Sequence, residues 1–248
     1  PSSEIYDGLS AVYDYGQWGT ELKRNVRDHW WRSMTQFHEN IVGIDAAIFM
    51  HPTTWKASGH VDNFSDPMID CKTCKGRFRA DQTDEIACPQ KPSQCVNECH
   101  GEKTAPRAFN LMFQTYVGPV QDESAVAYLR PETAQAIFAQ FKNVLETSRQ
   151  KVPFGIAQVG KAFRNEVTPR NYTFRSREFE QMEMEFFCHE DEALDWYAFW
   201  REYRMKWWEE LGLAGENLIL RDHDQDELSH YSKGTCDIEY RFPFTFPE

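Results

Sequence analysis

Arginine and glutamate are segregated along one short segment, residues 163–187. The arginines occupy its first part and the glutamates continue through its second part, and the residues concerned are Arg164, Arg170, Arg175, Arg177, Glu180, Glu183 and Glu185. The planar guanidinium of arginine suits phosphate and carboxylate oxygens, whereas a carboxylate suits an ammonium group. A segment that collects both kinds of side chain indicates a binding site for a ligand that carries both charges.

The second part of this segment has the alternation of a β-strand. Successive side chains of a strand point to opposite faces, so Gln181, Glu183 and Glu185 are expected on one face, opposite an apolar face. A half-exposed strand with an acidic solvent side explains the alternation as well. The neighbouring arginines favour the interpretation as the floor of a pocket for a cationic group.

Five of the seven cysteines lie between Cys71 and Cys99. Two pairs have the spacing of metal ligands, Cys71 with Cys74 and Cys95 with Cys99. Four thiolates in two such pairs suit tetrahedral zinc, and Cys88 could replace Cys95. The alternative is a set of free cysteines in a mobile loop.

The composition is that of a globular protein, because 41% hydrophobic and 15% aromatic residues can form a sizeable core. A net charge of -12 argues against attraction of nucleic acid to the whole surface, so any such contact is expected to be local and basic. The chain has no apolar run of about 18 residues and no charged-then-apolar leader, so we expect neither a membrane span nor a signal peptide. Clustered cysteines without secretory signals indicate a reducing cytoplasm.

Several elements must position these side chains. Apolar residues at helical spacing predict helices over residues 20–39 and 191–212, and a third that starts near Pro131 and Glu132. Apolar or alternating runs predict strands over 41–50, 108–118, 154–164, 175–187, 215–223 and 236–242. Helices that flank consecutive strands favour an α+β fold with a mostly antiparallel sheet.

Two of these helices have a defined face that should be buried. The helix over 20–39 is expected to bury Leu22, Val26, Trp30, Met34 and Phe37. The helix after Glu132 is expected to bury Ala134, Ile137, Phe138, Phe141 and Leu145. Residues 67–104 are rich in Cys, Lys, Pro and Gln, and we expect them to form a small, loop-rich insertion.

The arginine- and glutamate-rich segment closely resembles motif 2 of class II aminoacyl-tRNA synthetases. That motif reads Phe-Arg-x-Glu, a variable loop, then Arg-x-x-x-Phe-x-x-x-Glu, and the matching residues here are Arg164, Glu166, Arg175, Phe179 and Glu183. The stretches "SSEIYDGL", "HPTTWKASGH", "PRAFNLMF" and "YLRPETAQAIF" look like the dimeric glycyl-tRNA synthetase family. The resemblance runs from residue 2 to about residue 243.

The resemblance implies a class II synthetase-like catalytic domain in two parts, residues 1–66 and 105–248, interrupted by a zinc-type insertion at 67–104. The helix, strand and proline of residues 20–52 are similar to motif 1 and imply a homodimer, although an ordinary core helix and strand fit the same periodicity. Motif 3 and an anticodon-binding domain are expected outside these residues, so this fragment alone is expected to lack part of the ATP site.

The activity implied is that of a glycine–tRNA ligase. Such an enzyme uses ATP with Mg²⁺ to convert glycine into glycyl-adenylate and pyrophosphate, then transfers the glycyl group to the 3' end of tRNA(Gly). The family needs no protein nucleophile, so catalysis would consist of positioning and charge stabilisation. Glycine has no side chain to recognise, and its selection would depend on the exclusion of larger amino acids.

The resemblance also implies a role for each matching residue. Arg164 would hold the α-phosphate and the amino-acid carboxylate. Glu166 would accept a hydrogen bond from the adenine amino group, Arg175 would reach the far end of ATP, and Phe179 would stack on adenine.

The glycine ammonium would lie between Glu132 and Glu183, with Glu185 as a weaker candidate. Glu132 is equally explained as a simple acid at a helix N-terminus. The basic contacts to the tRNA end would be Arg170 and Lys161, which could instead be ordinary solvated charges.

Two other classes of protein compete with this hypothesis. A non-catalytic, synthetase-like regulator would have no need for the set Arg164, Phe179 and Glu183. A zinc-dependent nucleic-acid-binding module is disfavoured by the net charge of -12. His60 and His230 are assigned no catalytic role, because a lone histidine is more often a packed or hydrogen-bonded residue.

Overall fold

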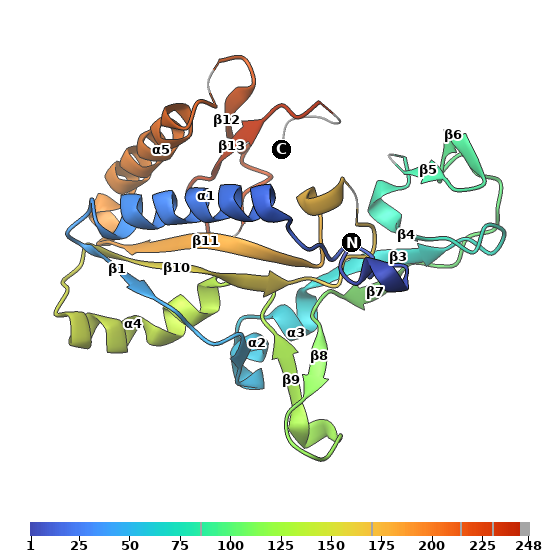
Figure 1. The fold of residues 1–248 in the computed structure, drawn as a ribbon, viewed down its shortest axis with the longest axis horizontal. Helices are drawn as coiled ribbons and strands as arrows, with labels where there is room; N and C mark the ends of the chain where they lie inside the picture. Colours follow the sequence, from blue (N-terminus) through green and yellow to red (C-terminus); the bar gives the residue numbers. More distant parts are fainter. Residues whose placement is uncertain (85, 170, 214, 230, 244–248) are drawn as a thin grey trace. The chain divides into compact units, whose positions relative to one another are not determined.

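The structure is a computed structural model that describes residues 1–84, 86–169, 171–213, 215–229 and 231–243 (Figure 1). The chain divides into two compact units, Pro1–Phe186 and Phe187–Glu248. Both units combine helices with small sheets, which confirms the α+β prediction.

The helices and strands have the following bounds. The α-helices are α1 (Gln17–Thr35), α2 (Pro52–Ala57), α3 (His60–Asn63), α4 (Ala134–Ser148) and α5 (Ala193–Glu210), and the 3-10 turns are η1 (Glu4–Tyr6), η2 (Ala80–Gln82), η3 (Glu123–Ala125), η4 (Tyr172–Phe174) and η5 (Glu190–Glu192). The strands are β1 (Ile41–Ile44), β2 (Phe49–Met50), β3 (Ser65–Asp70), β4 (Arg77–Arg79), β5 (Ala87–Cys88), β6 (Lys91–Cys95), β7 (Arg107–Asn110), β8 (Gln114–Tyr116), β9 (Val126–Leu129), β10 (Phe154–Phe163), β11 (Glu178–Phe187), β12 (Leu218–Asp222) and β13 (Cys236–Tyr240). No helix in the described part of the chain is long and apolar enough to cross a membrane.

The sheet that carries the motif 2-like segment has the strand order β1-β10-β11. Strand β1 runs parallel to β10, with Ile41 opposite Gly155. The pairs β3–β4, β3–β7, β5–β6, β2–β9, β8–β9 and β12–β13 are antiparallel, so the sheets are mostly antiparallel as predicted. Strand β10 supplies much of the core of the first unit, because Phe154, Ile156 and Ala157 are fully buried.

Helices α1 and α4 lie on opposite sides of β10 and β11 (Figure 1). Lys23 of α1 forms a 2.7 Å ion pair with Glu180 of β11, so the even-numbered side of β11 faces α1. Strand β1 admits α1 closely at Gly43, where a Cβ atom would come within 2.2 Å of the Trp31 ring. The Trp31 ring of α1 therefore packs directly on the backbone of β1, in the space that a side chain at position 43 would fill.

Helix α1 buries less than its periodicity predicts. Trp30 and Met34 are buried as expected, but Leu22 is 66% exposed and Phe37 is 72% exposed. Phe37 lies beyond the helix, which ends at Thr35. The buried residues of α1 all lie in its second half, so only that half packs on the core. The predicted burial of Leu22 and Phe37 was therefore wrong.

The predicted strand over residues 41–50 is in fact two strands in different sheets, β1 beside β10 and β2 beside β9. Side chains divert the backbone between them, because the Ala46 N–H donates to Gln158 Oε1 at 2.8 Å and the Ala46 carbonyl accepts from Arg130 at 3.0 Å. The predicted strand over 108–118 is likewise divided, into β7 and β8. The Asn110 side chain accepts from the Met112 N–H at 2.8 Å at that break.

Helix α4 begins at Ala134, three residues after Pro131, close to its predicted start. Ala134 and Ile137 are buried as expected, whereas Phe138 is 53% exposed and its predicted burial was wrong. The preceding Arg130 is buried and donates to the Lys161 carbonyl at 2.7 Å. Gly160 permits this approach, since a Cβ atom there would lie 2.2 Å from Arg130 Nη2.

The cysteine-rich segment forms a small core of its own around Ile69, Cys71, Phe78 and Val96. Strand β3 lies between β4 and β7 in one sheet, while β5 and β6 form a two-stranded sheet. The segment is therefore an ordered module with short strands and a small core that includes a buried thiol and a buried aromatic ring.

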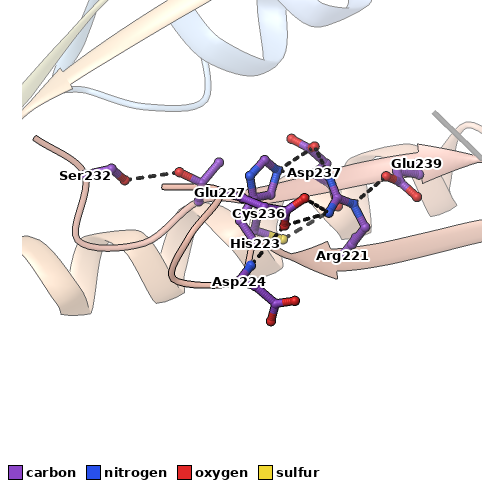
Figure 2. Close-up of polar contacts among 9 residues, drawn as sticks. Arg221, His223, Asp224, Glu227, Ser232, Cys236, Asp237 and Glu239 are labelled. Carbon is purple, nitrogen blue, oxygen red and sulfur yellow. Dashed lines mark hydrogen bonds and ion pairs between the residues drawn. The ribbon is translucent and has the colours of Figure 1, made fainter. Parts of the chain in front are cut away.

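The second unit contains α5, β12 and β13. The helix predicted over 191–212 ends at Glu210, and Gly212 follows with φ +89, a conformation that favours glycine at a helix end. Strands β12 and β13 pair as a hairpin with Leu218 opposite Tyr240, in the two regions predicted to be strands. A polar network centred on Arg221 and Asp237 lies on this hairpin (Figure 2).

Candidate active site

Arg164 follows β10 directly and is held from several sides. Its backbone N–H donates to the Arg177 carbonyl at 2.9 Å, and its Nε donates to the Pro131 carbonyl at 3.1 Å. Its guanidinium carbon lies 5.3 Å from the ring centroid of Phe179 and 5.6 Å from that of Phe64. Of the three guanidinium nitrogens of Arg164, only Nε has a hydrogen-bond partner in the described part of the chain, so both Nη groups can donate to an anion.

Aromatic rings continue from Phe64 into the "HPTTWKASGH" stretch. The ring centroids of Phe64 and His60 are 5.2 Å apart, and those of His60 and Trp55 are 5.6 Å apart. Trp55 is fully buried, so this series of rings is anchored in the core. The guanidinium of Arg164 is thereby positioned by cation–π contacts as well as by its hydrogen bond.

Glu132, at the start of α4, has two hydrogen-bond donors. His60 Nε2 lies 3.3 Å from Glu132 Oε1, and Gln135 Nε2 donates to the same oxygen at 2.6 Å. The hydrogen bond from His60 is the main cause that lowers the pKa of Glu132, with Gln135 and the charge of Arg164 adding to it against partial burial. Glu132 is therefore an anion at neutral pH and accepts hydrogen bonds.

Glu183 points from β11 toward the start of α4. The Thr133 hydroxyl donates to Glu183 Oε2, and the Thr133 N–H donates to Gln181 Oε1 at 3.1 Å. Gln181 and Glu183 thus share one face, which confirms the predicted alternation, while Glu180 lies on the face toward α1. Burial raises the pKa of Glu183, with repulsion from Glu132 in the same direction, although the Thr133 hydroxyl and Arg164 oppose the shift.

Glu185 is the third carboxylate of this face. Burial, and then the charges of Glu183 and Glu132, raise its pKa to about 7. Three carboxylates thus influence one another electrostatically, with Arg164 as a nearby cation. Such a group of acids disfavours its own ionisation, and a bound cation would relieve this repulsion.

Arg175, a predicted ATP-binding residue, influences two acids away from Arg164, namely Asp66 on β3 and Asp81 in the cysteine-rich segment. Its charge lowers the pKa of Asp66 and Asp81, although burial is the largest influence on Asp66 and raises its pKa overall. Arg79 ties the two acids together, with Nη1 3.0 Å from Asp66 and Nη2 2.7 Å from Asp81. Arg175 Nη1 is buried and has no hydrogen-bond partner within the described residues.

The other residues predicted to bind adenine or the tRNA end make contacts away from the three glutamates or lie outside the described residues. The Glu166 N–H donates to the Arg164 carbonyl at 2.8 Å, so Glu166 starts the loop next to the site. Lys161 is half exposed and pairs with Glu178 on the adjacent strand. Arg170 and His230 lie outside the described residues. The structure therefore brings together Arg164, Phe179 and the three glutamates, and places Arg175 and Lys161 at other contacts.

Sequence reasoning missed His60, Phe64 and Thr133 as members of this site. His60 stood in a family-like stretch but was assigned no role, and Phe64 belongs to a short segment with no distinguishing pattern. Thr133 follows Glu132 directly, and its position at the helix N-cap was its only signal. Their contacts depend on residues that are distant along the chain.

The cysteine-rich region brings several thiols together. The Cys71 side chain hydrogen-bonds those of Cys74 and Cys99, and the Cys88 side chain also hydrogen-bonds Cys99. Cys95 is opposite Ala87 in the β5–β6 pair, outside this set of contacts. Among the described residues, no group of three or more His, Cys, Asp or Glu side chains is arranged to hold a metal ion. The zinc prediction is therefore not confirmed by the side-chain arrangement.

The chain belongs to the class II tRNA synthetase core family. Residues 113–245 match the family described as "tRNA synthetase class II core domain (G, H, P, S and T)", a range that includes Glu132, Arg164 and Glu183. Membership agrees with the fold and with a site that combines one arginine with three carboxylates.

Within this family, the chain is similar to proteins named Glycine--tRNA ligase. It is 54% identical to that of Borreliella burgdorferi (strain ZS7) over 249 residues, which cover 100% of this chain and 55% of the relative. It is 52% identical to that of Treponema denticola, again over 100% of this chain and 54% of the relative. The chain thus spans about half the length of the curated relatives it matches.

A solved structure described as the RNA binding domain of threonyl-tRNA synthetase from Cryptosporidium parvum Iowa II covers 82% of this chain and 36% of its own, with 16% sequence identity and a TM-score of 0.47. A similarity this low supports no conclusion about the site.

Proposed function

We propose that this chain is the amino-acid-activating part of a glycine–tRNA ligase. The observation that supports it most is the position of Arg164 beside Glu132 and Glu183, because a zwitterionic amino acid needs a cation for its carboxylate and anions for its ammonium. The relatives named Glycine--tRNA ligase, at 54% and 52% identity over the whole chain, support glycine as the amino acid.

In the proposed reaction the glycine carboxylate attacks the α-phosphorus of ATP, with Mg²⁺ bound to the triphosphate. A phosphorus–oxygen bond forms to glycine and the bond to the pyrophosphate leaving group breaks, giving glycyl-adenylate. The terminal ribose hydroxyl of tRNA(Gly) then attacks the activated carbonyl and releases AMP. Arg164 would stabilise the negative charge that develops at the α-phosphate, while the protein supplies position rather than a nucleophile.

The glycine ammonium would bind between Glu132 and Glu183, with Glu185 behind them. The selection of glycine would depend on a lack of room for a side chain, since there is no group on glycine for the protein to recognise. Phe179 and Glu166 would bind adenine, Arg175 would reach the far end of ATP, and Lys161 and Arg170 would contact the tRNA end.

The domain organisation that we propose retains residues 1–66 and 105–248 as two parts of one catalytic domain. The segment 67–104 between them is a structural insertion in this proposal. Its small core around Ile69, Cys71, Phe78 and Val96 supports a locally stabilised module. The relatives are about twice as long as this chain, so the activity is to be tested with the full-length protein.

A structural zinc ion is proposed for the insertion, because four thiolates from two closely spaced pairs suit tetrahedral zinc. Cys71, Cys74 and Cys99 would be ligands, and the hydrogen bond between Cys88 and Cys99 favours Cys88 over Cys95 as the fourth. The described side chains would have to rotate to form the coordination sphere. Zinc would hold the segment together, without a part in the chemical step.

A cytoplasmic homodimer is the assembly that we propose. Large apolar side chains are exposed near the N-terminus and on the first half of α1, among them Ile5 (86%), Tyr6 (81%), Trp18 (83%) and Leu22 (66%). Apolar side chains this exposed favour burial against another surface. A second copy of the chain is the proposed partner because Leu22 belongs to the motif 1-like segment of residues 20–52, and Trp18 lies one helical turn before Leu22 on α1.

The test is ATP–pyrophosphate exchange by the full-length protein, with glycine, alanine and serine compared. Exchange that depends on glycine and is weak with alanine and serine is expected. A non-catalytic, synthetase-like regulator is the alternative function, and it predicts no exchange with any amino acid. Absence of glycine-dependent exchange in the full-length protein would therefore overturn the proposed function.

A further inference from the structure

Two glutamates of the candidate site each accept side-chain hydrogen bonds through one carboxylate oxygen only, within the described residues. On Glu132, both His60 and Gln135 contact Oε1, at 3.3 and 2.6 Å. On Glu183, the Thr133 hydroxyl donates to Oε2. Within the described residues, no side chain donates a hydrogen bond to Glu132 Oε2 or to Glu183 Oε1, while the Thr133 backbone also hydrogen-bonds the Glu183 carboxylate. Each carboxylate can therefore accept a further hydrogen bond through a defined oxygen.

His60 is itself held firmly. Its Nδ1 lies 2.9 Å from Ser58 Oγ, and its ring packs against Trp55 and Phe64. The side chain is 12% exposed, so the ring has little freedom to turn away from Glu132. Because an ionised carboxylate can only accept, the hydrogen bond requires that His60 Nε2 carries a proton and donates it.

Thr133 is buried completely and occupies the N-cap position of α4. Its hydroxyl does not cap the helix, and it donates to Glu183 instead. Its N–H donates to Gln181 Oε1 at 3.1 Å, and its carbonyl accepts from Gln158 Nε2 at 3.0 Å. The hydroxyl is therefore fixed on a rigid backbone that links α4 with β10 and β11.

We infer that His60 and Thr133 are positioning residues that orient Glu132 and Glu183 toward the ammonium group of the amino-acid substrate. This inference rests on the proposed function and deepens it. His60 and Thr133 each donate a side-chain hydrogen bond to one oxygen of their glutamate, and the other oxygen, which no side chain contacts within the described residues, would accept from the ammonium. A carboxylate that is already oriented loses less freedom when the substrate binds, so the orientation favours binding.

The test for His60 measures ATP–pyrophosphate exchange by the full-length protein as a function of glycine and, separately, of ATP. His60→Ala should raise the glycine KM by about tenfold or more, which is the size expected for a hydrogen bond to a charged group, with the ATP KM changed by less than about twofold. His60→Gln keeps an N–H donor near the position of Nε2 and should recover part of the loss. If His60 had only a general structural role, His60→Ala would raise the KM of both glycine and ATP, and His60→Gln would not restore the glycine KM.

Thr133 permits a second, independent test with little change of shape. Thr133→Val removes the hydroxyl and should raise the glycine KM selectively by about tenfold, whereas Thr133→Ser keeps the hydroxyl and should stay within about threefold of the wild type. Thermal unfolding of each variant shows whether the fold is retained.

The matched control is His223 in the second unit, which also contacts a carboxylate. His223 Nε2 lies 2.8 Å from Asp237 Oδ2, and the His223 side chain is 18% exposed (Figure 2). His223→Gln should leave the glycine KM unchanged, because this pair belongs to the Arg221 network and not to the site.

The outcomes distinguish a failure of the proposed function from a failure of the positioning role of His60 and Thr133. No glycine-dependent exchange by the wild-type protein contradicts the proposed function. Normal exchange by the wild type, together with an unchanged glycine KM in folded His60→Ala and Thr133→Val variants, overturns the positioning role alone. A rise in the ATP KM equal to that in the glycine KM also contradicts it.

Discussion

Arg164 Nε donates a hydrogen bond of 3.1 Å to the carbonyl of Pro131. This contact joins the end of β10 to the residue that precedes Glu132, although the two are far apart along the chain. It places the guanidinium that would bind phosphate and carboxylate next to the acid that would bind the ammonium. The electrostatic influence of Arg164 on both Glu132 and Glu183 follows from this arrangement.

Arg164→Ala should reduce the kcat/KM of glycine-dependent pyrophosphate exchange by about 10²–10³-fold, the cost expected for loss of a donor to charge in a transition state. The measurement is made on the full-length protein. Arg164→Lys keeps the charge without the planar fork and should lie between the wild type and alanine. A loss of less than about threefold for Arg164→Ala would show that this residue does not bind the reacting phosphate.

Glu183→Gln should chiefly weaken glycine binding, because the substitution preserves size and hydrogen bonding but removes the negative charge opposite the ammonium. We expect the glycine KM to rise by about tenfold or more and the ATP KM to change by less than about twofold. The control is Glu180→Gln, on the opposite face of β11 beside Lys23, which should leave the glycine KM unchanged. Equal effects of the two substitutions would contradict the assignment of the ammonium to one face.

Glu185 should make the protein less stable as the pH rises. Its pKa is raised from 4.5 to about 7 in the folded protein, so between those values the folded state binds more protons than the unfolded state. The free energy of unfolding therefore falls as the pH increases through that window. Glu185→Gln removes this contribution, so at pH 8 the variant should be the more stable by up to about 3 kcal/mol.

Thermal or urea unfolding at pH 5 and pH 8 measures this effect. The difference in free energy of unfolding between Glu185→Gln and the wild type should be larger at pH 8 than at pH 5. Glu190→Gln is the control, because Lys233 lowers the pKa of that exposed carboxyl. This variant should be less stable than the wild type at pH 8, the opposite of Glu185→Gln. A wild-type advantage over Glu185→Gln at pH 8 would mean that the carboxylate is stabilised by a contact that its surroundings do not reveal.

The zinc hypothesis predicts different behaviour for two cysteines. Cys88→Ser should lower the zinc content of the purified full-length protein and its thermal stability, as should Cys71→Ser, because the loss of one thiolate weakens a four-ligand site. Cys95→Ser should retain zinc, since Cys95 lies outside the thiol contacts that join Cys71, Cys88 and Cys99. Elemental analysis measures the metal. The absence of stoichiometric zinc in the wild type would reject the site altogether.

The exposed apolar face of α1 predicts self-association. Trp18→Glu combined with Leu22→Glu should shift the full-length protein from dimer to monomer, because charged side chains oppose burial of this face. Light scattering after size-exclusion chromatography measures the mass. Phe138→Glu is the control, as Phe138 is 53% exposed on α4 rather than on α1. A dimer that survives the double substitution would place the interface elsewhere.

The sequence by itself determined those features that local pattern or motif spacing controls. The period of two along residues 178–187 predicted that Gln181 and Glu183 share a face, and their contacts with Thr133 confirm it. The helices after Glu132 and over 191–212 follow from apolar periodicity and from signals such as Pro131 and Gly212. The motif 2-like spacing predicted Arg164 and Glu183 as site residues, whereas Glu132 was predicted from the "YLRPETAQAIF" stretch and Glu185 as a weaker candidate.

Only the tertiary structure decided which distant groups meet. The Gln158 and Arg130 side chains engage the backbone at Ala46, which divides one predicted strand into β1 and β2. Likewise, neither periodicity nor spacing indicates that His60 contacts Glu132, that Cys88 contacts Cys99, or that Leu22 remains exposed. The physical reason is the same in each case: hydrogen bonding and burial depend on the three-dimensional packing of segments that the local sequence does not relate to one another.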